Sequence, residues 1–234
     1  MKKTVVILGL ITFCSTSAKL WAAEGEQTIS ISYASIQSDA LKNAVRDYGH
    51  RTDAFVSGYN ASGSSYTASG RADSYNDMRG ITLKYRYEMT DQWGVVAAFS
   101  HVSQEFKGTV NASKEVKKGP TTTTTYAWSS SDAYGSVKGT LNSLLVGPSY
   151  RLNDYVSGYA LAGVAKTKIE YRQAQSMGSS DSASSWEQNK TSVAYGLGLQ
   201  INPVKNIAID LAWEGSGTGE WQTRGFNIGL GYSF

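Results

Sequence analysis

The sequence contains few of the residues that disulfide-rich and metal-binding proteins depend on. Its 234 residues include one cysteine, two histidines and three prolines. A single cysteine excludes an internal disulfide. The sequence also shows no metal-ligand cluster, phosphate-binding loop or nucleotide-binding motif, so we expect no cofactor and no metal. No segment approaches the roughly 18 consecutive apolar residues of a membrane-spanning helix.

The positive charge of the chain comes from its first residues. The whole sequence has a formal net charge of +3, which alone would favour a nucleic-acid partner. Residues 1–23, however, begin with two lysines, continue with an apolar run and end in small residues, the layout of a secretory signal peptide. Cleavage there removes three lysines and no acid. The mature domain, residues 24–234, then has no net formal charge, and we expect no nucleic-acid partner.

Two features of this leader leave alternatives open. Trp21 is bulky for a position two before a cut after Ala23, so a cut after Ala18 is a second candidate. Cys14 leaves with the signal. A lipid anchor on Cys14 is the alternative, although Phe13 is too large for the small residue that usually precedes a lipidated cysteine. Without Cys14 the mature chain has no thiol, which suits an oxidising compartment.

Eight segments of the mature sequence alternate between apolar and polar residues, the period of a β-strand with one apolar face. They read TISISY, GITLKYRYEM, WGVVAAFSHV, NSLLVGPSYRL, YVSGYALAGVAKTKIEY, SVAYGLGLQIN, IAIDLAWE and FNIGLGYSF. The eighth segment runs to the last residue, Phe234. Because chain ends fray unless they are tied down, we expect this strand to be paired along its whole length.

The connections between these segments alternate in length. Strands two and three, four and five, and six and seven are joined by tight turns. The other neighbours are joined by loops, and the first two loops, about Ser38–Arg79 and Glu105–Thr140, are very long. Such asymmetry is typical of outer-membrane barrels. The pattern predicts an all-β fold, an eight-stranded antiparallel up-and-down transmembrane β-barrel with short periplasmic turns and long extracellular loops, in the outer membrane of a Gram-negative cell.

The same alternation assigns each residue to a face. The apolar parity is expected in lipid, where it includes Leu83, Leu161, Leu197 and Ile209. The other parity is small or charged, and eight strands leave room inside only for side chains. Its charges must then neutralise one another, which predicts an interior network of Lys84, Arg86, Glu88, Arg151, Lys166, Lys168, Glu170, Asp210 and Glu214. Closure would pair strand eight with strands seven and one.

A secreted soluble β-sandwich or lipocalin-like barrel is the alternative architecture. Its apolar parity would face inward, and the charged parity would face water. The asymmetry of the loops and the aromatic strand at the C-terminus favour the membrane barrel.

The long loops hold the candidate ligand contacts. The first loop combines tyrosine, serine and glycine, the composition of adaptable binding surfaces, and its tyrosines are Tyr48, Tyr59, Tyr66 and Tyr75. In the second loop Lys114, Lys117 and Lys118 would suit lipopolysaccharide phosphates or a sulfated host glycan. The plainer alternatives are a solvated, partly disordered first loop and a lysine run that is only a solvated face.

An enzymatic alternative rests on His101 and Ser103, which share the outward parity near the extracellular end. The stretch FSHVS resembles the His-x-Ser pair of outer-membrane lipid A deacylases. Gln104 stands where those enzymes have asparagine, and no residue is identified as the orienting acid. We therefore expect no catalytic residue and no enzyme activity, with a lipid A-modifying enzyme as the weakest alternative.

Four stretches form a specific combination: GITLKYRYEMTDQWGVVAAFS, VGPSYRLNDYVSGYALAGVA, TSVAYGLGLQINPVKNIAIDLAWE and GFNIGLGYSF. Together they resemble the attachment-invasion-locus/OmpX/Lom family of small enterobacterial outer-membrane proteins, and WEGSGTGEW is most similar to the phage-encoded Lom branch. The resemblance implies an eight-stranded barrel. It also implies roles in adhesion to host cells, invasion, serum resistance or intracellular survival, without enzyme activity.

The resemblance suggests partners as well. We expect outer-membrane lipid and lipopolysaccharide around a monomeric barrel, and host extracellular-matrix or serum proteins at its loops. The first two loops look longer than the family pattern, so the family's ligand preferences are not carried over. The competing function is a structural or stress-type barrel without a specific ligand, as in OmpX-like relatives.

Overall fold

The structure, a computed structural model, describes residues 25–61, 67–117, 123–129, 135–177 and 180–234, and the predicted leader lies outside them. The elements are β1 (Gln27–Ser38), α1 (Asp39–Ala61), β2 (Thr67–Ala72), β3 (Met78–Glu88), β4 (Trp93–Lys117), β5 (Thr123–Ser129), β6 (Gly135–Asn153), β7 (Val156–Met177), β8 (Ser180–Val204), β9 (Ile207–Ser216), the 3-10 helix η1 (Gly219–Trp221) and β10 (Thr223–Ser233). Within these residues no helix is both long and apolar enough to cross a membrane.

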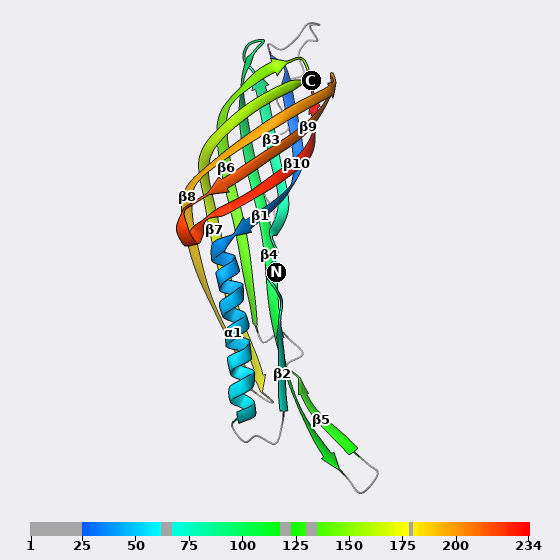
Figure 1. Cartoon of the computed structure of the whole chain (residues 1–234), viewed down its shortest axis with the longest axis vertical. Coiled ribbons are helices and arrows are strands. Elements are labelled where there is room, and N and C mark those ends of the chain that lie inside the picture. The colour runs from blue at the N-terminus through cyan, green and yellow to red at the C-terminus, as the bar shows by residue number, and fades with distance from the viewer. Residues whose placement is uncertain (1–24, 62–66, 118–122, 130–134, 178–179) are drawn as a thin grey trace.

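Eight of the strands close into an antiparallel barrel (Figure 1). Their order is β4, β3, β1, β10, β9, β8, β7 and β6, and the pairing of β6 with β4 completes the ring. The last strand pairs with β9 on one side and β1 on the other. The main-chain N–H groups of Gln27 and Phe234 each donate to the other's carbonyl oxygen at 2.9 Å. This confirms the predicted fold and the pairing of the terminal strand, which lipid demands because it cannot satisfy a free backbone edge.

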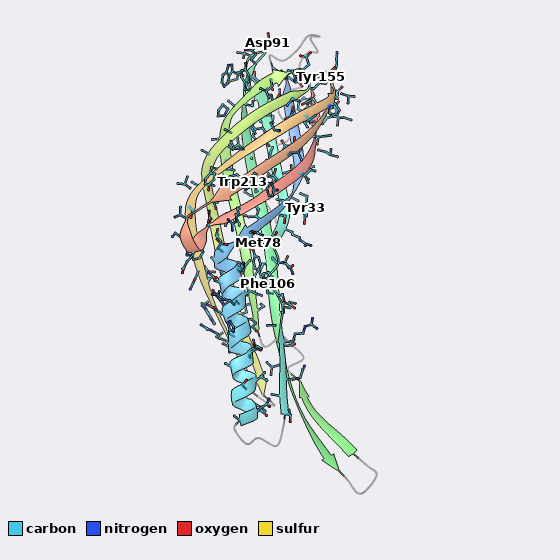
Figure 2. The ribbon with its side chains drawn as sticks, viewed as in Figure 1. Tyr33, Met78, Asp91, Phe106, Tyr155 and Trp213 are labelled. Atoms are coloured by element: carbon cyan, nitrogen blue, oxygen red, sulfur yellow. The ribbon has the colours of Figure 1, made fainter. Side chains whose placement is uncertain are left out.

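The outer face of the barrel is apolar, with aromatic residues at both ends. Leu197 exposes 60% of its surface and Leu230 exposes 63%. In Figure 2 Tyr155 lies at the end with the tight turns, while Tyr33 and Trp213 lie at the opposite end. An apolar band between aromatic girdles is the lipid-facing surface of an outer-membrane barrel. The predicted lipid-facing parity is confirmed on β1, β3, β4, β6, β8, β9 and β10.

On β7 the predicted parity is wrong. Tyr159 and Leu161 are each 6% exposed and Ile169 is 1% exposed, so the odd-numbered residues of this strand face the interior. Val164, of the other parity, is 52% exposed. Tyr155 shares the odd parity but precedes the first residue of β7, so its exposure does not define the face of the strand. Leu161 therefore lies inside the barrel and not in lipid.

Beyond the ends of the barrel strands, the chain continues as an extracellular extension, here the described residues of 39–77, 104–139 and 169–193 (Figure 1). In it β2 pairs with one edge of β4 and β5 pairs with the other. β7 and β8 remain paired up to the contact of Met177 with Ser180. The second long loop and the loop between β7 and β8 therefore consist largely of strands that lengthen the barrel wall.

The first long loop also contains a helix that the strand pattern did not predict. α1 covers 23 residues, and the hydroxyl of Ser38 caps it by accepting the main-chain N–H of Leu41 at 3.3 Å. Asp39 lies in the first turn, where a negative charge suits the helix dipole. The buried residues recur at helical spacing: Ala40, Leu41, Ala44, Val45 and Thr52. The interpretation of residues 39–61 as a solvated loop is wrong.

The first turns of α1 pack against the extracellular end of the barrel. Leu41 is fully buried in a cluster that also contains Met78, Phe106 and Leu141. Gly139 makes room for it, because a Cβ at that position would lie 2.4 Å from a Leu41 methyl carbon. A second buried cluster, which includes Val96, Leu145 and Leu161, lies within the barrel. Side chains thus fill the described interior at both levels.

Candidate functional site

The first polar group inside the barrel is centred on Lys84, which is 5% exposed. Its Nζ forms an ion pair with Asp210 and donates to the hydroxyl of Tyr159 at 3.0 Å and to Oδ1 of Asn227 at 2.5 Å. The Tyr159 hydroxyl also donates to Asp210 at 2.9 Å. Four strands, β3, β7, β9 and β10, therefore meet at one buried charge pair. A buried ion pair persists when its remaining donors and acceptors are satisfied in this way.

The second polar group surrounds Glu214, which is 5% exposed. Its carboxylate accepts hydrogen bonds from the hydroxyl of Ser100 at 2.9 Å and from that of Ser143. The Ser100 hydroxyl also lies 2.9 Å from that of Thr82. Glu214 is thus held by hydroxyl groups, whereas the sequence suggested a direct cationic partner.

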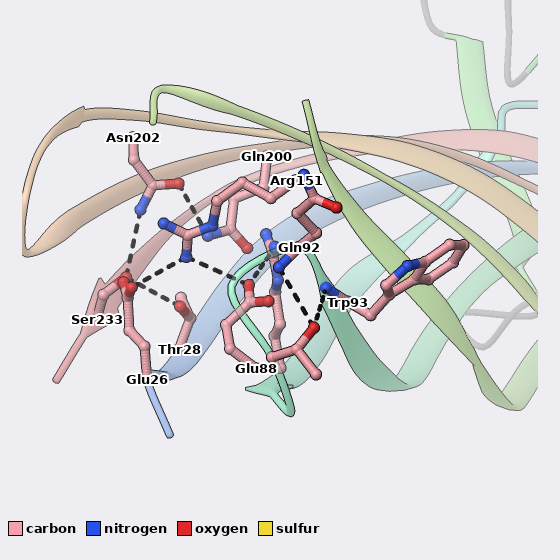
Figure 3. A network of polar contacts seen from close by, with 11 residues as sticks. Glu26, Thr28, Glu88, Gln92, Trp93, Arg151, Gln200, Asn202 and Ser233 are labelled. Atoms are coloured by element: carbon pink, nitrogen blue, oxygen red, sulfur yellow. Dashed lines mark hydrogen bonds and ion pairs between the residues drawn. The ribbon is translucent and has the colours of Figure 1, made fainter. Parts of the chain in front are cut away.

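The third polar group closes the end of the barrel that carries the tight turns (Figure 3). Arg151 Nη2 lies 3.0 Å from Glu26 Oε2 and 3.5 Å from Glu88 Oε1. Arg86 pairs with Glu88 as well. The predicted interior charges Lys84, Arg86, Glu88, Arg151, Asp210 and Glu214 are thus brought together in three separate groups. Sequence reasoning missed Glu26, Tyr159 and Asn227, and the only signal for Asn227 is a polar residue of inward parity on the last strand.

Lys166, Lys168 and Glu170 do not belong to the interior network. They are even-numbered residues of β7, and the even-numbered residues of this strand face outward. The prediction that placed them inside the barrel is therefore wrong, as it is for Leu161 in the opposite sense. Lys168 Nζ lies 2.7 Å from Glu170 Oε1 and 2.8 Å from Glu187 Oε2. The hydrogen bond with Lys168 lowers the pKa of Glu170. Lys168, Glu170 and Glu187 form a surface ion cluster.

The four candidate tyrosines have different surroundings. The hydroxyl of Tyr75 accepts the main-chain N–H of Ser38 at 2.9 Å, and the ring stacks on Phe106 with centroids 5.8 Å apart. Burial raises the pKa of Tyr75. Tyr75 therefore packs within the extension. Tyr48 is half-buried against the cluster around Leu41, Tyr59 stacks on Phe55 at 6.3 Å, and Tyr66 lies outside the described residues.

The predicted lysine contacts lie at the far end of β4. Lys114 is opposite Tyr126 and Lys117 is opposite Thr123 in the pairing of β4 with β5. Their side chains, and all of Lys118, lie outside the described part of the chain. Their role as contacts for an anionic ligand stays a prediction.

The outward-facing His101 has an amide as its hydrogen-bond partner. Its Nδ1 lies 2.7 Å from Oδ1 of Asn142. Among the described residues no carboxylate is hydrogen-bonded to His101, and Ser103 carries no bond to the ring. A nucleophile and base that act together need that contact and an orienting group. The described residues also contain no group of three histidine, cysteine or acidic side chains able to hold a metal ion.

A groove of about 410 Å³ lies between α1 and the β7–β8 hairpin, and η1 contributes to one wall. We call it the α1 groove. Its lining is Ala40, Asn43, Ala44, Arg46, Asp47, Tyr48, Arg51, Ser136, Ile169, Tyr171, Arg172, Gln173, Trp186, Gln188, Glu220 and Trp221. Apart from Tyr48, sequence reasoning missed these residues, because they come together only when α1 packs beside the hairpin.

The comparison with protein families decides which family this barrel represents. Residues 52–234 match the family model described as "Enterobacterial Ail/Lom protein". The chain belongs to the Ail/Lom family. The match covers most of the chain and confirms the resemblance seen in the strands. It begins within α1, so the first turns of that helix precede the matched region of the Ail/Lom family.

Individual Ail/Lom proteins show the same relationship. The chain is 32% identical to the outer membrane protein Lom of Escherichia phage lambda over 176 residues, which cover 71% of this chain and 78% of that protein. It is 31% identical to the attachment invasion locus protein of Yersinia enterocolitica over 234 residues, with both chains covered completely. The crystal structure of Yersinia pestis Ail in complex with the heparin analogue sucrose octasulfate is similar with a TM-score of 0.57 and 27% identity, over 90% of this chain and 99% of that one.

These Ail/Lom relatives place the chain in the outer membrane. The protein is an outer-membrane barrel of the virulence and adhesion class, as predicted. Proteins of this family are outer-membrane barrels, and none of the relatives described here carries an enzyme name.

Proposed function

We propose that this protein binds a molecule on host cells or in their matrix through its extracellular extension. The single observation that supports this most is the combination of a filled barrel with a long, structured extension. Buried side chains occupy the described interior, so passage of a solute through the barrel is disfavoured. The extension is the part of the molecule that reaches away from the membrane surface.

The relatives support the same proposal. The name of the Yersinia enterocolitica protein contains attachment and invasion, and Yersinia pestis Ail binds a heparin analogue in its crystal structure. A host-surface molecule is therefore the class of partner that we assign to this chain, with lipopolysaccharide and outer-membrane lipid around the barrel itself. The second candidate function is a structural or stress-type barrel without a specific ligand.

Adhesion of whole cells tests the proposal when the extension is shortened and the barrel of the shortened variant still folds. In the shortened variant residues 47–73 become a glycine–serine linker, while residues 108–135 and 174–183 each become an Asn-Gly turn. Residues 39–46 are retained because Leu41, Ala44 and Val45 are buried against the barrel. We expect the shortened barrel to fold, since loop shortening changes the closure entropy by only about 0.6 kcal/mol per twofold change in length.

Heat-modifiable gel mobility reports folding in this experiment, and adhesion to cultured cells and to immobilised matrix protein reports binding. We expect cells with the parent protein to adhere and cells with the folded, shortened barrel to adhere no better than cells without the protein. If the folded, shortened barrel supports adhesion equal to that of the parent, the binding proposal is wrong and the structural barrel takes its place.

A further inference from the structure

We infer that the α1 groove is a binding site for an uncharged oligosaccharide. The inference rests on the proposed function, because it names the ligand class and the place on the extension where it binds. The volume of the α1 groove, about 410 Å³, lies within the roughly 300–1,000 Å³ that small-molecule sites usually occupy. The lining combines three properties: flat aromatic surfaces, a small net charge, and both hydrogen-bond donors and acceptors.

The aromatic surface is built across two strands. Tyr171 of β7 is directly opposite Trp186 of β8, and their rings stack with centroids 5.1 Å apart and planes 10° from parallel. Trp186 still exposes 42% of its surface, and Trp221 of η1 adds a second indole to the lining. The C–H groups of a pyranose ring carry small positive charges, and they pack favourably on the negative face of an aromatic ring. An exposed indole in a groove is thus a platform for a sugar.

The charged groups of the lining nearly cancel and leave one excess positive charge. Arg46, Arg51 and Arg172 supply positive charge, and Asp47 and Glu220 supply negative charge. Arg46 Nε lies 3.7 Å from Asp47 Oδ1, so part of the positive charge is already compensated within α1. One excess positive charge cannot neutralise a polysulfated chain, whose sulfates would also lie close to the two carboxylates. The near cancellation of charge therefore favours an uncharged ligand over a densely charged one.

The polar side chains of the groove suit the hydroxyl groups of a sugar, which both donate and accept hydrogen bonds. The carboxylates of Asp47 and Glu220 accept, the guanidinium of Arg51 donates, and the amides of Asn43 and Gln188 do both. Burial is the largest effect on Tyr171 and raises the pKa of its phenol. The negative charge of Asp47 also raises this pKa, while the positive charge of Arg51 lowers it. These charges therefore act at the Tyr171 phenol, which stays protonated at neutral pH and remains a donor.

The strand geometry supplies matched control positions. Gln188 is on the face of β8 that contributes Trp186 to the groove. Its neighbour Asn189 is opposite Lys168, on the face of the surface ion cluster. On α1, Asp47 lines the groove, whereas Asp53 is exposed and lies outside the lining. Each pair compares the same chemical change inside and outside the groove.

Binding to purified, folded protein in lipid nanodiscs tests the inference. The ligands are a panel of uncharged hexose and N-acetylhexosamine oligosaccharides, with a heparin-type sulfated oligosaccharide for comparison, and tryptophan fluorescence reports the Kd. We expect at least one uncharged oligosaccharide to bind, with a Kd that changes less than about twofold when salt is raised, because no ion pair with the ligand is screened. We expect Trp186→Ala to weaken binding by about tenfold or more, a loss equivalent to about 1.4 kcal/mol.

The paired variants make the result specific to the groove. Asp47→Ala and Gln188→Ala should each weaken binding several-fold, while Asp53→Ala and Asn189→Ala leave it unchanged. Heat-modifiable mobility confirms that every variant is folded. The inference is overturned if no uncharged oligosaccharide binds, if Trp186→Ala binds as well as the parent, or if only the sulfated ligand binds and salt abolishes that binding. Loss of cell adhesion in the shortened variant together with any of these results would leave the proposed function intact and remove only this site.

Discussion

The phenol oxygen of Tyr75 accepts a hydrogen bond from the main-chain N–H of Ser38 at 2.9 Å, where β1 ends and α1 begins. The ring of Tyr75 also stacks on Phe106 of β4. Ser38 in turn caps α1 through its hydroxyl. This contact therefore links the start of the helix, the segment before β3 and the extended part of β4. Three stretches far apart in the sequence are fixed together at the extracellular end of the barrel.

The burial of Tyr75 predicts that alkaline pH loosens α1, while the hydrogen bond from Ser38 opposes this effect by lowering the pKa of the phenol. Burial raises the pKa of Tyr75 above its ordinary value of 10.0, so the phenol in a released segment loses its proton at a lower pH than the docked phenol. The contribution of Tyr75 to docking is complete below pH 10.0 and is lost as pH rises through the folded-state pKa. We expect subtilisin to cleave α1 faster as the pH rises above 10.0 than it does at neutral pH. Tyr75→Phe should weaken docking at neutral pH and flatten the alkaline dependence; an unchanged pH profile in Tyr75→Phe would contradict the assignment.

The packing of α1 predicts a large effect at Leu41. Leu41→Ala removes a fully buried side chain from the cluster at the barrel end, and such changes typically cost about 2–5 kcal/mol. We expect hydrogen exchange in the first turns of α1 to accelerate while the barrel strands stay protected. The matched variant Lys42→Ala changes an exposed neighbour and should have little effect. Equal exchange in the two variants would show that α1 is not docked through Leu41.

The buried pair of Lys84 and Asp210 predicts a strong coupling. Lys84→Met leaves a carboxylate buried without its cation, which typically costs about 3–5 kcal/mol. The double variant Lys84→Met, Asp210→Asn removes both charges and should recover part of that loss. Urea unfolding in lipid vesicles, followed by tryptophan fluorescence, measures both. Additive losses in the double variant would mean that the two charges do not interact.

The outer face predicts a penalty for charge in lipid. Leu83 and Leu197 are outward on β3 and β8, exposing 41% and 60% of their surface. Arginine at a lipid-facing position near the midplane of a barrel typically costs about 2–4 kcal/mol. We expect Leu83→Arg and Leu197→Arg to lower the free energy of unfolding in vesicles by this amount. Ser185→Arg, at an exposed position of the extension, is the control, and an equal loss there would count against the membrane assignment.

Much of the barrel could be predicted from the sequence because lipid and a closed interior impose one simple rule. Alternation of apolar and polar residues identifies a strand and its two faces. The short connections identify the periplasmic end of the barrel, and the long connections identify its extracellular end. Ile29, Leu83 and Leu230 accordingly lie on the outer face. The helix α1 also left a signal, in the capping Ser38 and the helical spacing of its buried residues. Strand periodicity alone does not reveal this signal.

The sequence by itself thus determined the eight barrel strands, the alternation of short and long connections, the family and the outer-membrane location. Tertiary structure decided which way β7 faces. Tyr159 can point inward because Gly198 leaves the space that its ring occupies; a Cβ there would lie 2.2 Å from that ring. It also decided which charges meet and that α1 forms a groove beside the β7–β8 hairpin. These outcomes depend on contacts between residues distant in the sequence, and the packing of one side chain against another is not encoded in the periodicity of either strand.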